Sequence, residues 1–245
     1  MRMRKKKNGD KRLAACAHLL REKPDTPIES TLRDFGYEAE MRLEVGCGKG
    51  GFACGMAKKH QNACFYALER VSDVMVLAVE KAEREREERK TDNLRFLLAG
   101  AAELSEYFAP GSLSVIYLNF SDPWPKKGHT RRRLTYRGFL RVYFSLLKKG
   151  GELRLKTDNV GLFDFTLEEL SALGLTPYFL TRDLHRTPEA AENVMTEYER
   201  NFSEQGIPIC SLAVRKEGEL PSLEDAEEKR ISSLDSREER LSDQV

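Results

Sequence analysis

The sequence lacks the paired cysteines that mark a disulfide framework or a zinc site. Its five cysteines are odd in number, widely spaced and never form a C-x-x-C pair, and its four histidines are equally scattered. Cysteines used in this way are typical of reduced thiols in a reducing compartment. No zinc spacing can be assembled from these residues, so we expect neither disulfides nor a bound metal.

The sequence also lacks an apolar run long enough to cross a membrane. Its N-terminus carries cations but not the apolar core of a signal peptide. We therefore expect a cytoplasmic protein with no membrane partner. A length of 245 residues suits one α/β core, and nothing in the sequence indicates a second.

Net charge is low, at +1, but it is distributed unevenly. Residues 216–245 hold ten acids and five bases, which leaves a net charge of about +6 on the rest of the chain. A basic body favours a polyanionic partner, whereas the acidic tail reads as disordered. Residues 1–12 contain seven cations and one acid, which predicts an arm that is either disordered or in contact with a polyanion.

Short apolar runs alternate with helical segments, a pattern typical of an open α/β sheet. In such sheets, ligands bind beyond the carboxyl ends of the strands, so the polar residues there are the first candidates for a site. The strands are expected at residues 41–45, 63–68, 94–98, 114–118, 152–156, 175–181 and 207–214.

A glycine turn, GCGKGG at 46–51, follows the first strand and precedes a helix expected at 52–59. A helix N-terminus favours an anionic or polar ligand, and Gly46 and Gly48 let the backbone turn tightly and approach it. Glu69 ends the next strand about 20 residues later, where an acid can hold the two ribose hydroxyls of a nucleoside cofactor. The alternative for Glu69 is an acid that leads the following helix.

Glu44, just before the glycines, favours S-adenosylmethionine over NAD. A carboxylate there can hold a methionine ammonium directly or through water, and a dinucleotide would not need it. Glu44 could instead be a charged strand end. After the third strand, Gly100 and Ala101 offer only backbone groups to an adenine amine, and Glu103 lies one turn too late.

The stretch YLNFSDPWPKKGHTRRR at 117–133 ends an apolar strand abruptly. Pro123 and Pro125 exclude both a strand ladder and a helix, and the next periodic segment begins near Tyr136. A connection of roughly 15 residues is more often functional than idle. This loop carries Asp122, Trp124 and a run of cations. The alternative is a solvated loop anchored by a buried tryptophan.

Two later polar stretches have both a structural and a functional interpretation. Asp158 and Asn159 follow the strand at 152–156, where either one caps a helix or binds a ligand. The residues TEYE at 196–199 match a capping box, which is a structural signal in itself.

The segments LEVGCGKG, YLNFSDPWPKKGHTRRRLTY, LKTDN and TEYE, in this order, closely resemble the bacterial tRNA (guanine-N7-)-methyltransferase family. The resemblance runs from the N-terminus to about Arg215, and its DPWPKK motif is highly specific. It implies a doubly wound Rossmann-type methyltransferase sheet of about seven mostly parallel strands with helices on both faces. This domain would span residues 13–215, between the arm and the tail.

The resemblance also implies an activity, the transfer of a methyl group from S-adenosylmethionine to N7 of guanosine 46 in the variable loop of tRNA. A monomer and a homodimer are both compatible with it. The chain departs from the family at Gly100, where an acid or amide is usual. The implied roles are cofactor binding for Glu44, Gly46, Gly48, Glu69, Ala101 and Asp122, catalysis for Asp122, substrate binding for Lys126, Asp158, Thr196, Glu197, Tyr198 and Glu199, and RNA contact for Lys127, Arg131, Arg132 and Arg133.

The chemistry of guanine constrains the role of Asp122. N7 has a lone pair and no proton, so its attack on a methyl group needs no general base. A carboxylate can accept hydrogen bonds from N1–H and the exocyclic amine but is repelled by the O6/N7 edge. We expect Asp122 to orient the base and to stabilise the positive charge that develops on it. Trp124 either packs on the sheet, which its flanking prolines favour, or stacks on a base.

Two other functions remain open at this point. A methyltransferase for a small molecule or an exocyclic amine would leave the basic arm and Arg131 to Arg133 without use, and a methyltransferase for another RNA base is a related alternative. A non-catalytic RNA-binding Rossmann module would have no use for Glu44 and Glu69 together with the glycines.

Overall fold

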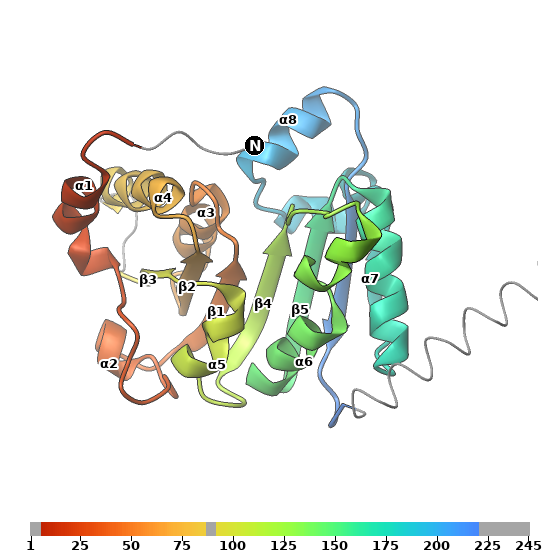
Figure 1. Cartoon of the computed structure of the whole chain (residues 1–245), viewed down its shortest axis with the longest axis horizontal. Coiled ribbons are helices and arrows are strands. Elements are labelled where there is room, and N and C mark those ends of the chain that lie inside the picture. Colours follow the sequence, from red (N-terminus) through yellow and green to blue (C-terminus); the bar gives the residue numbers. More distant parts are fainter. Residues whose placement is uncertain (1–5, 87–91, 221–245) are drawn as a thin grey trace, which may run out of the picture.

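Seven strands form one sheet in the computed structural model, which describes residues 6–86 and 92–220 (Figure 1). The strand order is β3-β2-β1-β4-β5-β7-β6, and β7 alone runs in the direction opposite to the other strands. This sheet confirms the predicted α/β class and the seven predicted strand positions. The strands are β1 Glu40–Val45, β2 Ala63–Glu69, β3 Leu94–Leu98, β4 Leu113–Asn119, β5 Leu147–Thr157, β6 Phe179–Thr181 and β7 Cys210–Arg215.

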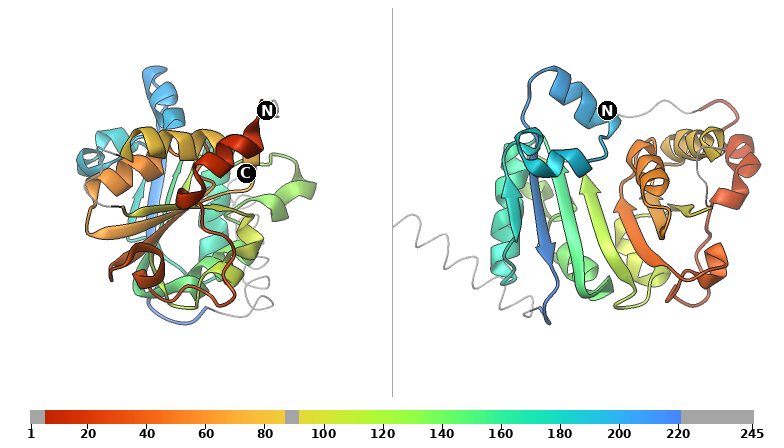
Figure 2. Two further views of the ribbon diagram at one scale, coloured as in Figure 1. Left: turned by 90° about the vertical axis from the view of Figure 1, so that its left-hand side faces the viewer. Right: turned by 180° about the vertical axis from the view of Figure 1, so that it is seen from behind.

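Helices cover both faces of the sheet (Figures 1 and 2). One face packs against α1 Gly9–Ala15, η1 Ala17–Leu19, α3 Gly51–Lys59 and α4 Ser72–Arg84, and the other packs against α5 Leu104–Tyr107, α6 Arg137–Leu146 and α7 Val160–Ala172. The remaining helices are α2 Leu32–Phe35, α8 Glu197–Glu204 and the short 3-10 turns η3 Ala101–Glu103, η4 Lys127–Arg132, η5 Leu184–Arg186 and η6 Pro188–Glu192.

Alternating side chains of the central strands fill two separate cores. On β2, Phe65 and Ala67 pack with α3 and α4, whereas Tyr66 and Leu68 pack with the helices of the opposite face. Strands that are buried on both faces have no solvent-facing side for polar residues. These segments therefore appear in the sequence as continuous apolar runs.

The strand order reverses between β1 and β4, which are neighbours in the sheet although β2 and β3 separate them in the chain. Loops that leave two such strands diverge to opposite faces and open a crevice between them. The glycine turn after β1 and the proline-rich loop after β4 both begin there. Helix α8 lies above these strand ends, at the top of Figure 1.

The boundary between α6 and β5 differs from the prediction. The strand was expected only at 152–156, but β5 begins at Leu147 and includes the residues KKGG at 148–151. Pairing with β4 shifts between Leu113 and Val115, so β5 bulges there. Gly150 has φ of +76°, and a Cβ on Gly151 would lie 2.9 Å from the Lys148 carbonyl oxygen. The glycines therefore permit the bulge.

The N-terminal segment is more ordered than the predicted arm. Helix α1 starts at Gly9, and Arg12 donates to both carboxylate oxygens of Glu80 on α4, at 2.7 and 2.6 Å. The disordered interpretation therefore does not apply to residues 6–12. Residues 1–5, 87–91 and 221–245, which include the start of the predicted arm and most of the acidic tail, lie outside the described residues. No helix among residues 6–86 and 92–220 has the length and apolar character needed to span a membrane.

Candidate active site

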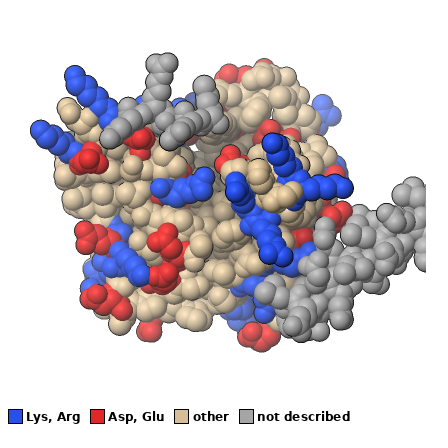
Figure 3. Space-filling view, in the orientation of Figure 1, with Lys and Arg blue, Asp and Glu red and all other residues tan. Residues whose placement is uncertain are grey.

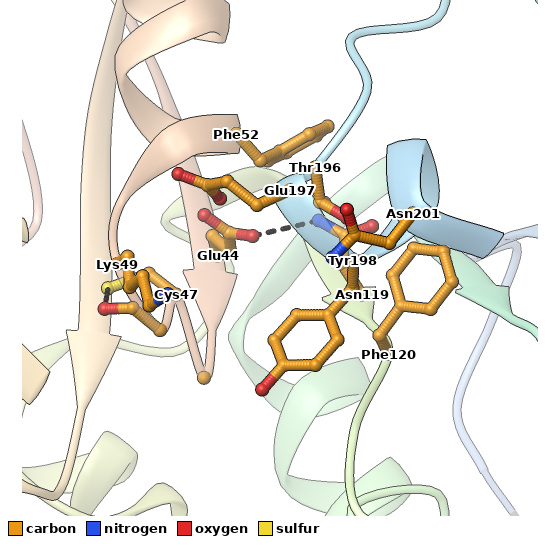
Figure 4. Close-up of a pocket in the computed structure, with 12 residues that line it drawn as sticks. Glu44, Cys47, Lys49, Phe52, Asn119, Phe120, Thr196, Glu197, Tyr198 and Asn201 are labelled. Carbon is orange, nitrogen blue, oxygen red and sulfur yellow. Dashed lines mark hydrogen bonds between the residues drawn. The ribbon is translucent and has the colours of Figure 1, made fainter. Parts of the chain in front are cut away.

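Two adjoining cavities open beyond the carboxyl ends of β1, β2, β4 and β5. The smaller has a volume of about 290 Å³ and the larger about 900 Å³, and both are lined by Gly46, Gly48, Phe120 and Tyr198. Figure 4 shows the smaller one. Most of the predicted site residues line one or both of them, namely Glu44, Gly46, Gly48, Glu69, Ala101, Asp122, Arg131, Arg132, Asp158, Thr196, Glu197 and Tyr198.

Glu44 lies at the inner end of the smaller cavity with only 4% of its surface exposed. One carboxylate oxygen accepts a hydrogen bond from Asn119 Nδ2 at 2.9 Å, whereas Oε2 has no partner among the described residues (Figure 4). Burial raises the pKa of Glu44 to about 7, against the opposing effects of the Asn119 bond and the Lys156 charge. A buried carboxylate with one open oxygen beside a cavity fits a cationic group such as an ammonium.

The glycine turn places its backbone between the two cavities. Gly46 and Gly48 have φ of +80° and +56°, which residues with a Cβ rarely adopt. Gly48 N–H donates to one oxygen of Glu69 at 3.2 Å, and Val71 N–H donates to the other at 2.9 Å. Glu69 thus supports both the turn and the start of α4, and it also lines the larger cavity. The interpretation as an acid that leads the following helix is therefore confirmed, and the ribose role stays a prediction.

The loop after β4 is held in a strained conformation. Phe120 and Trp124 have φ of +51° and +41°, a region that large side chains seldom occupy. Arg133 donates to the carbonyl oxygens of Pro123 and Trp124, at 2.9 and 3.2 Å, and Phe120 stacks on Phe202. These contacts fix the loop from outside.

Asp122 lies within this loop and is exposed on the wall of the larger cavity. It forms no hydrogen bond or ion pair with any residue in the described ranges. Its carboxylate is therefore free to bind a ligand. Trp124 is half-buried on the same wall, with the Arg132 guanidinium 5.1 Å from its ring and His129 at its edge.

The cations of the loop divide into two groups. Lys126, Lys127, Arg131 and Arg132 are exposed. Figure 3 shows several Lys and Arg side chains gathered on the right half of the face drawn there. Lys126 and Lys127 line neither cavity. Arg133 differs from the others, because its guanidinium is used by the loop carbonyls and lies 4.3 Å from the Phe165 ring.

The structure distinguishes the two candidate caps after β5. Asn159 Oδ1 accepts from Leu162 N–H at 2.8 Å and so caps α7. Asp158 is left half-buried on the wall of the larger cavity, where a ligand can reach it.

The residues 196–199 form the capping box of α8, as the sequence pattern predicts, and yet three of them line the cavities. Thr196 Oγ1 accepts from Glu199 N–H at 2.9 Å, and Glu199 Oε2 accepts from Thr196 N–H. Tyr198 is 61% exposed at the mouth of both cavities, whereas Glu199 is fully buried and pairs with Lys156. The capping role therefore leaves Thr196, Glu197 and Tyr198 available on the walls.

Glu197 joins α8 to the opposite wall of the smaller cavity. Its Oε1 accepts from Lys81 Nζ on α4 at 2.6 Å. Burial would raise the pKa of Glu197, but the bond from Lys81 outweighs it and the pKa is lowered. A Cβ on Gly51, at the start of α3, would collide with the Glu197 carboxylate, so this carboxylate is packed closely against the helix.

Sequence reasoning missed Asn119 and Lys156. Both are buried polar residues at the ends of apolar strands, and they are paired in the register of β4 and β5. Their only signal in the sequence is a polar residue where a buried strand finishes. No cluster of His, Cys, Asp or Glu within residues 6–86 and 92–220 is arranged to hold a metal ion.

Comparisons with known proteins agree with this geometry. Residues 38–212 match a family model described as a putative methyltransferase. The chain is 42% identical over 216 residues to a tRNA (guanine-N(7)-)-methyltransferase of Lactococcus lactis subsp. cremoris, covering 88% of this chain and 98% of that protein. A relative of the same name from Halalkalibacterium halodurans is 39% identical over 225 residues, covering 91% of this chain and all of that protein.

Solved structures are similar in fold. The 16S rRNA methyltransferase KamB aligns with a TM-score of 0.55 and 17% identity over 73% of this chain and 88% of that chain. An antibiotic-related methyltransferase aligns with a TM-score of 0.54, also at 17% identity, over 78% of this chain and 96% of that chain. At these identities the likeness concerns the fold alone.

Proposed function

The chain belongs to the tRNA (guanine-N(7)-)-methyltransferase family, and from that premise we propose that it methylates N7 of guanosine 46 in the variable loop of tRNA. One observation of the molecule carries the proposal. Glu44 faces the smaller and Asp122 the larger of two cavities that meet at Gly46 and Gly48, so the acid assigned to the cofactor and the acid assigned to the base line adjoining cavities.

We assign the methionine end of S-adenosylmethionine to the smaller cavity and its adenosine to the larger. The open oxygen of Glu44 would accept from the ammonium, and Glu69 would accept from the ribose hydroxyls. When bound, this cofactor supplies a sulfonium methyl group that an unprotonated nitrogen can attack. Gly100 N–H is already used by Glu103 Oε1 at 2.7 Å, so we assign adenine to other backbone groups near Ala101.

Asp122 is the group proposed to hold the guanine. Its free carboxylate can accept from N1–H and the exocyclic amine, which turns N7 away from the acid and toward the methyl group. No proton leaves N7 in this reaction, so Asp122 acts by orientation and by stabilising the positive charge on the methylated ring. Tyr198 at the mouth of both cavities offers a face on which the base can stack.

The exposed cations beside the base pocket are proposed to bind the RNA backbone. Lys127, Arg131 and Arg132 can each reach a phosphate, and we assign Lys126 and Asp158 to the nucleotide itself. Arg133 was also predicted to contact RNA, but its bonds to Pro123 and Trp124 suit it to shaping the loop. We assign Glu199, through its burial, to support of the 196–198 wall.

The test is incubation of the protein with unmodified tRNA and S-adenosylmethionine labelled in its methyl group, followed by nucleoside mass analysis and mapping of the label. We expect label in 7-methylguanosine at position 46 alone. Transfer to another nucleoside would refute the specificity, and a tRNA with adenosine at position 46 is the matched control. Absence of binding heat with S-adenosylmethionine in calorimetry would refute an enzymatic function altogether.

A further inference from the structure

Lys156, near the end of β5, is a buried cation to which the chemistry above gives no role. Only 9% of its side chain is exposed. Its Nζ donates to Glu199 Oε2 at 2.6 Å, to Asn193 Oδ1 at 2.9 Å and to the Val194 carbonyl oxygen at 3.0 Å. An ammonium group has three protons, so all of its donor capacity is used.

All three bonds end on one segment, residues 193–199, which leads into α8. Within it, Glu199 accepts in turn from Thr196 N–H and Asn193 Nδ2, and His185 Nε2 lies 3.2 Å from its other oxygen. The same segment carries Thr196, Glu197 and Tyr198, which form one wall of the smaller cavity. The position of that wall therefore depends on bonds that converge on Lys156.

Lys156 also faces the opposite wall of the same cavity. It is the register partner of Asn119, which binds Glu44, and its Nζ lies 4.9 Å from the centre of the Phe52 ring. Its charge acts on Glu44, where it lowers the pKa against the effect of burial. One ammonium thus binds the segment that carries the wall proposed to meet the base, and it acts on the acid proposed to hold the cofactor.

We propose that Lys156 is a positioning residue for methyl transfer, which fixes the wall of Thr196, Glu197 and Tyr198 relative to Glu44. This inference rests on the proposed function. Its physical basis is alignment, because N7, the methyl carbon and the sulfur must lie in line, and a displacement of one wall by about 1 Å can cost about 100-fold in rate.

The test compares Lys156→Met with Lys149→Met, an exposed lysine on the same strand. Met is close to Lys in size but removes the charge and the three hydrogen bonds. We expect kcat for tRNA methylation to fall by about 100-fold in Lys156→Met and to stay unchanged in Lys149→Met. Lys156→Arg, which restores the charge but not the geometry, should recover part of the loss.

A second readout separates positioning from a general loss of structure. The affinity for S-adenosylhomocysteine, measured by calorimetry from pH 6 to 9, should rise as Glu44 ionises near pH 7 in the unaltered protein. Without the charge of Lys156 the pKa of Glu44 is higher, so this rise should move to higher pH. The other ionisable groups around this network are Glu197 and Glu199 on α8, Lys81 on α4, Cys47 and Lys49 in the glycine turn and His185 on η5. None of them is substituted in the variant, and Glu199, which loses its bond from Lys156, keeps His185 beside its other oxygen.

The outcomes decide clearly. A folded Lys156→Met with the kcat and the pH midpoint of the unaltered protein would overturn the inference. If that variant fails to fold, Asn193→Ala takes its place, because it removes one bond to Lys156 and leaves the lysine charge paired. A reduced kcat with unchanged cofactor affinity in Asn193→Ala supports the positioning role of Lys156. An unchanged kcat overturns that role. Failure of the proposed function is distinguishable, because the unaltered protein would then form no 7-methylguanosine.

Discussion

At the residue scale, the ionisation of Glu44 links cofactor binding to stability. Burial raises its pKa to about 7 in the folded protein, against about 4.5 when the chain is unfolded. Between these values the folded state binds more protons than the unfolded state, so stability falls as pH rises. The ionised Glu44 therefore lowers the stability of the ligand-free fold, as expected of an acid that is retained to bind a cation.

We predict that Glu44→Gln stabilises the ligand-free protein at pH 8. The amide keeps the shape and can accept from Asn119, but it has no charge to bury. The contribution of Glu44 to stability is fully present below pH 4.5 and is lost as pH rises through 7, a change on the order of 3 kcal/mol. Urea unfolding at pH 5 and pH 8 should show a difference between variant and unaltered protein only at pH 8. Equal differences at both pH values would contradict the shifted pKa. The variant should also lose S-adenosylhomocysteine affinity.

We predict that Asp122→Asn lowers kcat by roughly 100- to 1,000-fold while tRNA affinity survives, because the acid acts on the base and not on the backbone. Single-turnover transfer and filter binding measure the two quantities separately. Asp164→Asn, an acid on α7 that pairs with Arg182, is the matched control. A variant at Asp122 that retained the full rate would remove this residue from the site.

Some site residues could be predicted from the sequence because their signals are local. Glu44 and Glu69 follow from their distance to the glycines, and Asp122 from the prolines beside it. Lys156 and Asn119 could not be predicted, because their role arises only when β4 and β5 pair in one register and α8 closes over their ends. Such contacts join residues that are far apart in the chain, so local sequence patterns do not predict them.

At the scale of elements, the loop after β4 uses one arginine to hold its conformation and other cations to present positive charge. Arg133 donates to two loop carbonyls and packs on Phe165 of α7, and the loop contains two residues with positive φ. A strained conformation persists only where its surroundings fix it. Within residues 6–86 and 92–220, the side chains of the neighbouring cations at 126, 127, 131 and 132 form no comparable hydrogen bonds. One element therefore contains both an arginine that fixes the loop and a set of exposed cations, which we propose contact RNA.

We predict opposite phenotypes for these two groups. Arg133→Met should lower kcat by about 10- to 100-fold, because Asp122 loses its fixed position, while the salt dependence of tRNA binding stays unchanged. Lys127→Ala combined with Arg132→Ala should instead weaken tRNA binding and reduce the slope of log affinity against log salt by roughly one to two. Affinities at three salt concentrations test both. A reduced slope in Arg133→Met would show that this arginine contacts phosphate after all.

The limits of prediction at this scale are visible in β5. Its apolar centre was predicted from residue type, but its start was not. Two glycines after lysines indicate a helix end as readily as a bulge, and the choice depends on pairing with Leu113 and Val115 of β4. A local sequence pattern identifies a helix or strand, whereas its first and last residues depend on the strands with which it pairs.

At the scale of the whole molecule, charge is divided along the chain. Residues 221–245 hold eight acids and four bases, so residues 1–220 carry a net charge of about +5 against +1 for the full chain. The family match ends at residue 212, before this acidic segment. The charge of the segment can therefore be changed without altering the matched domain. Long-range attraction of tRNA to the basic body depends on total charge as well as on local contacts.

We predict that replacing the eight acids of residues 221–245 by Gln and Asn speeds the association of tRNA at low salt. The full chain then carries about +9, and attraction between opposite charges raises the association rate with little effect on dissociation. Stopped-flow fluorescence at 20 and 300 mM salt measures this, and the gain should vanish at the higher concentration because the charges are screened. A variant in which the four bases are neutralised instead should associate more slowly than the unaltered chain. If both variants match the unaltered protein, the acidic segment exerts no electrostatic effect on the RNA, and the basic surface beside the base pocket alone governs capture.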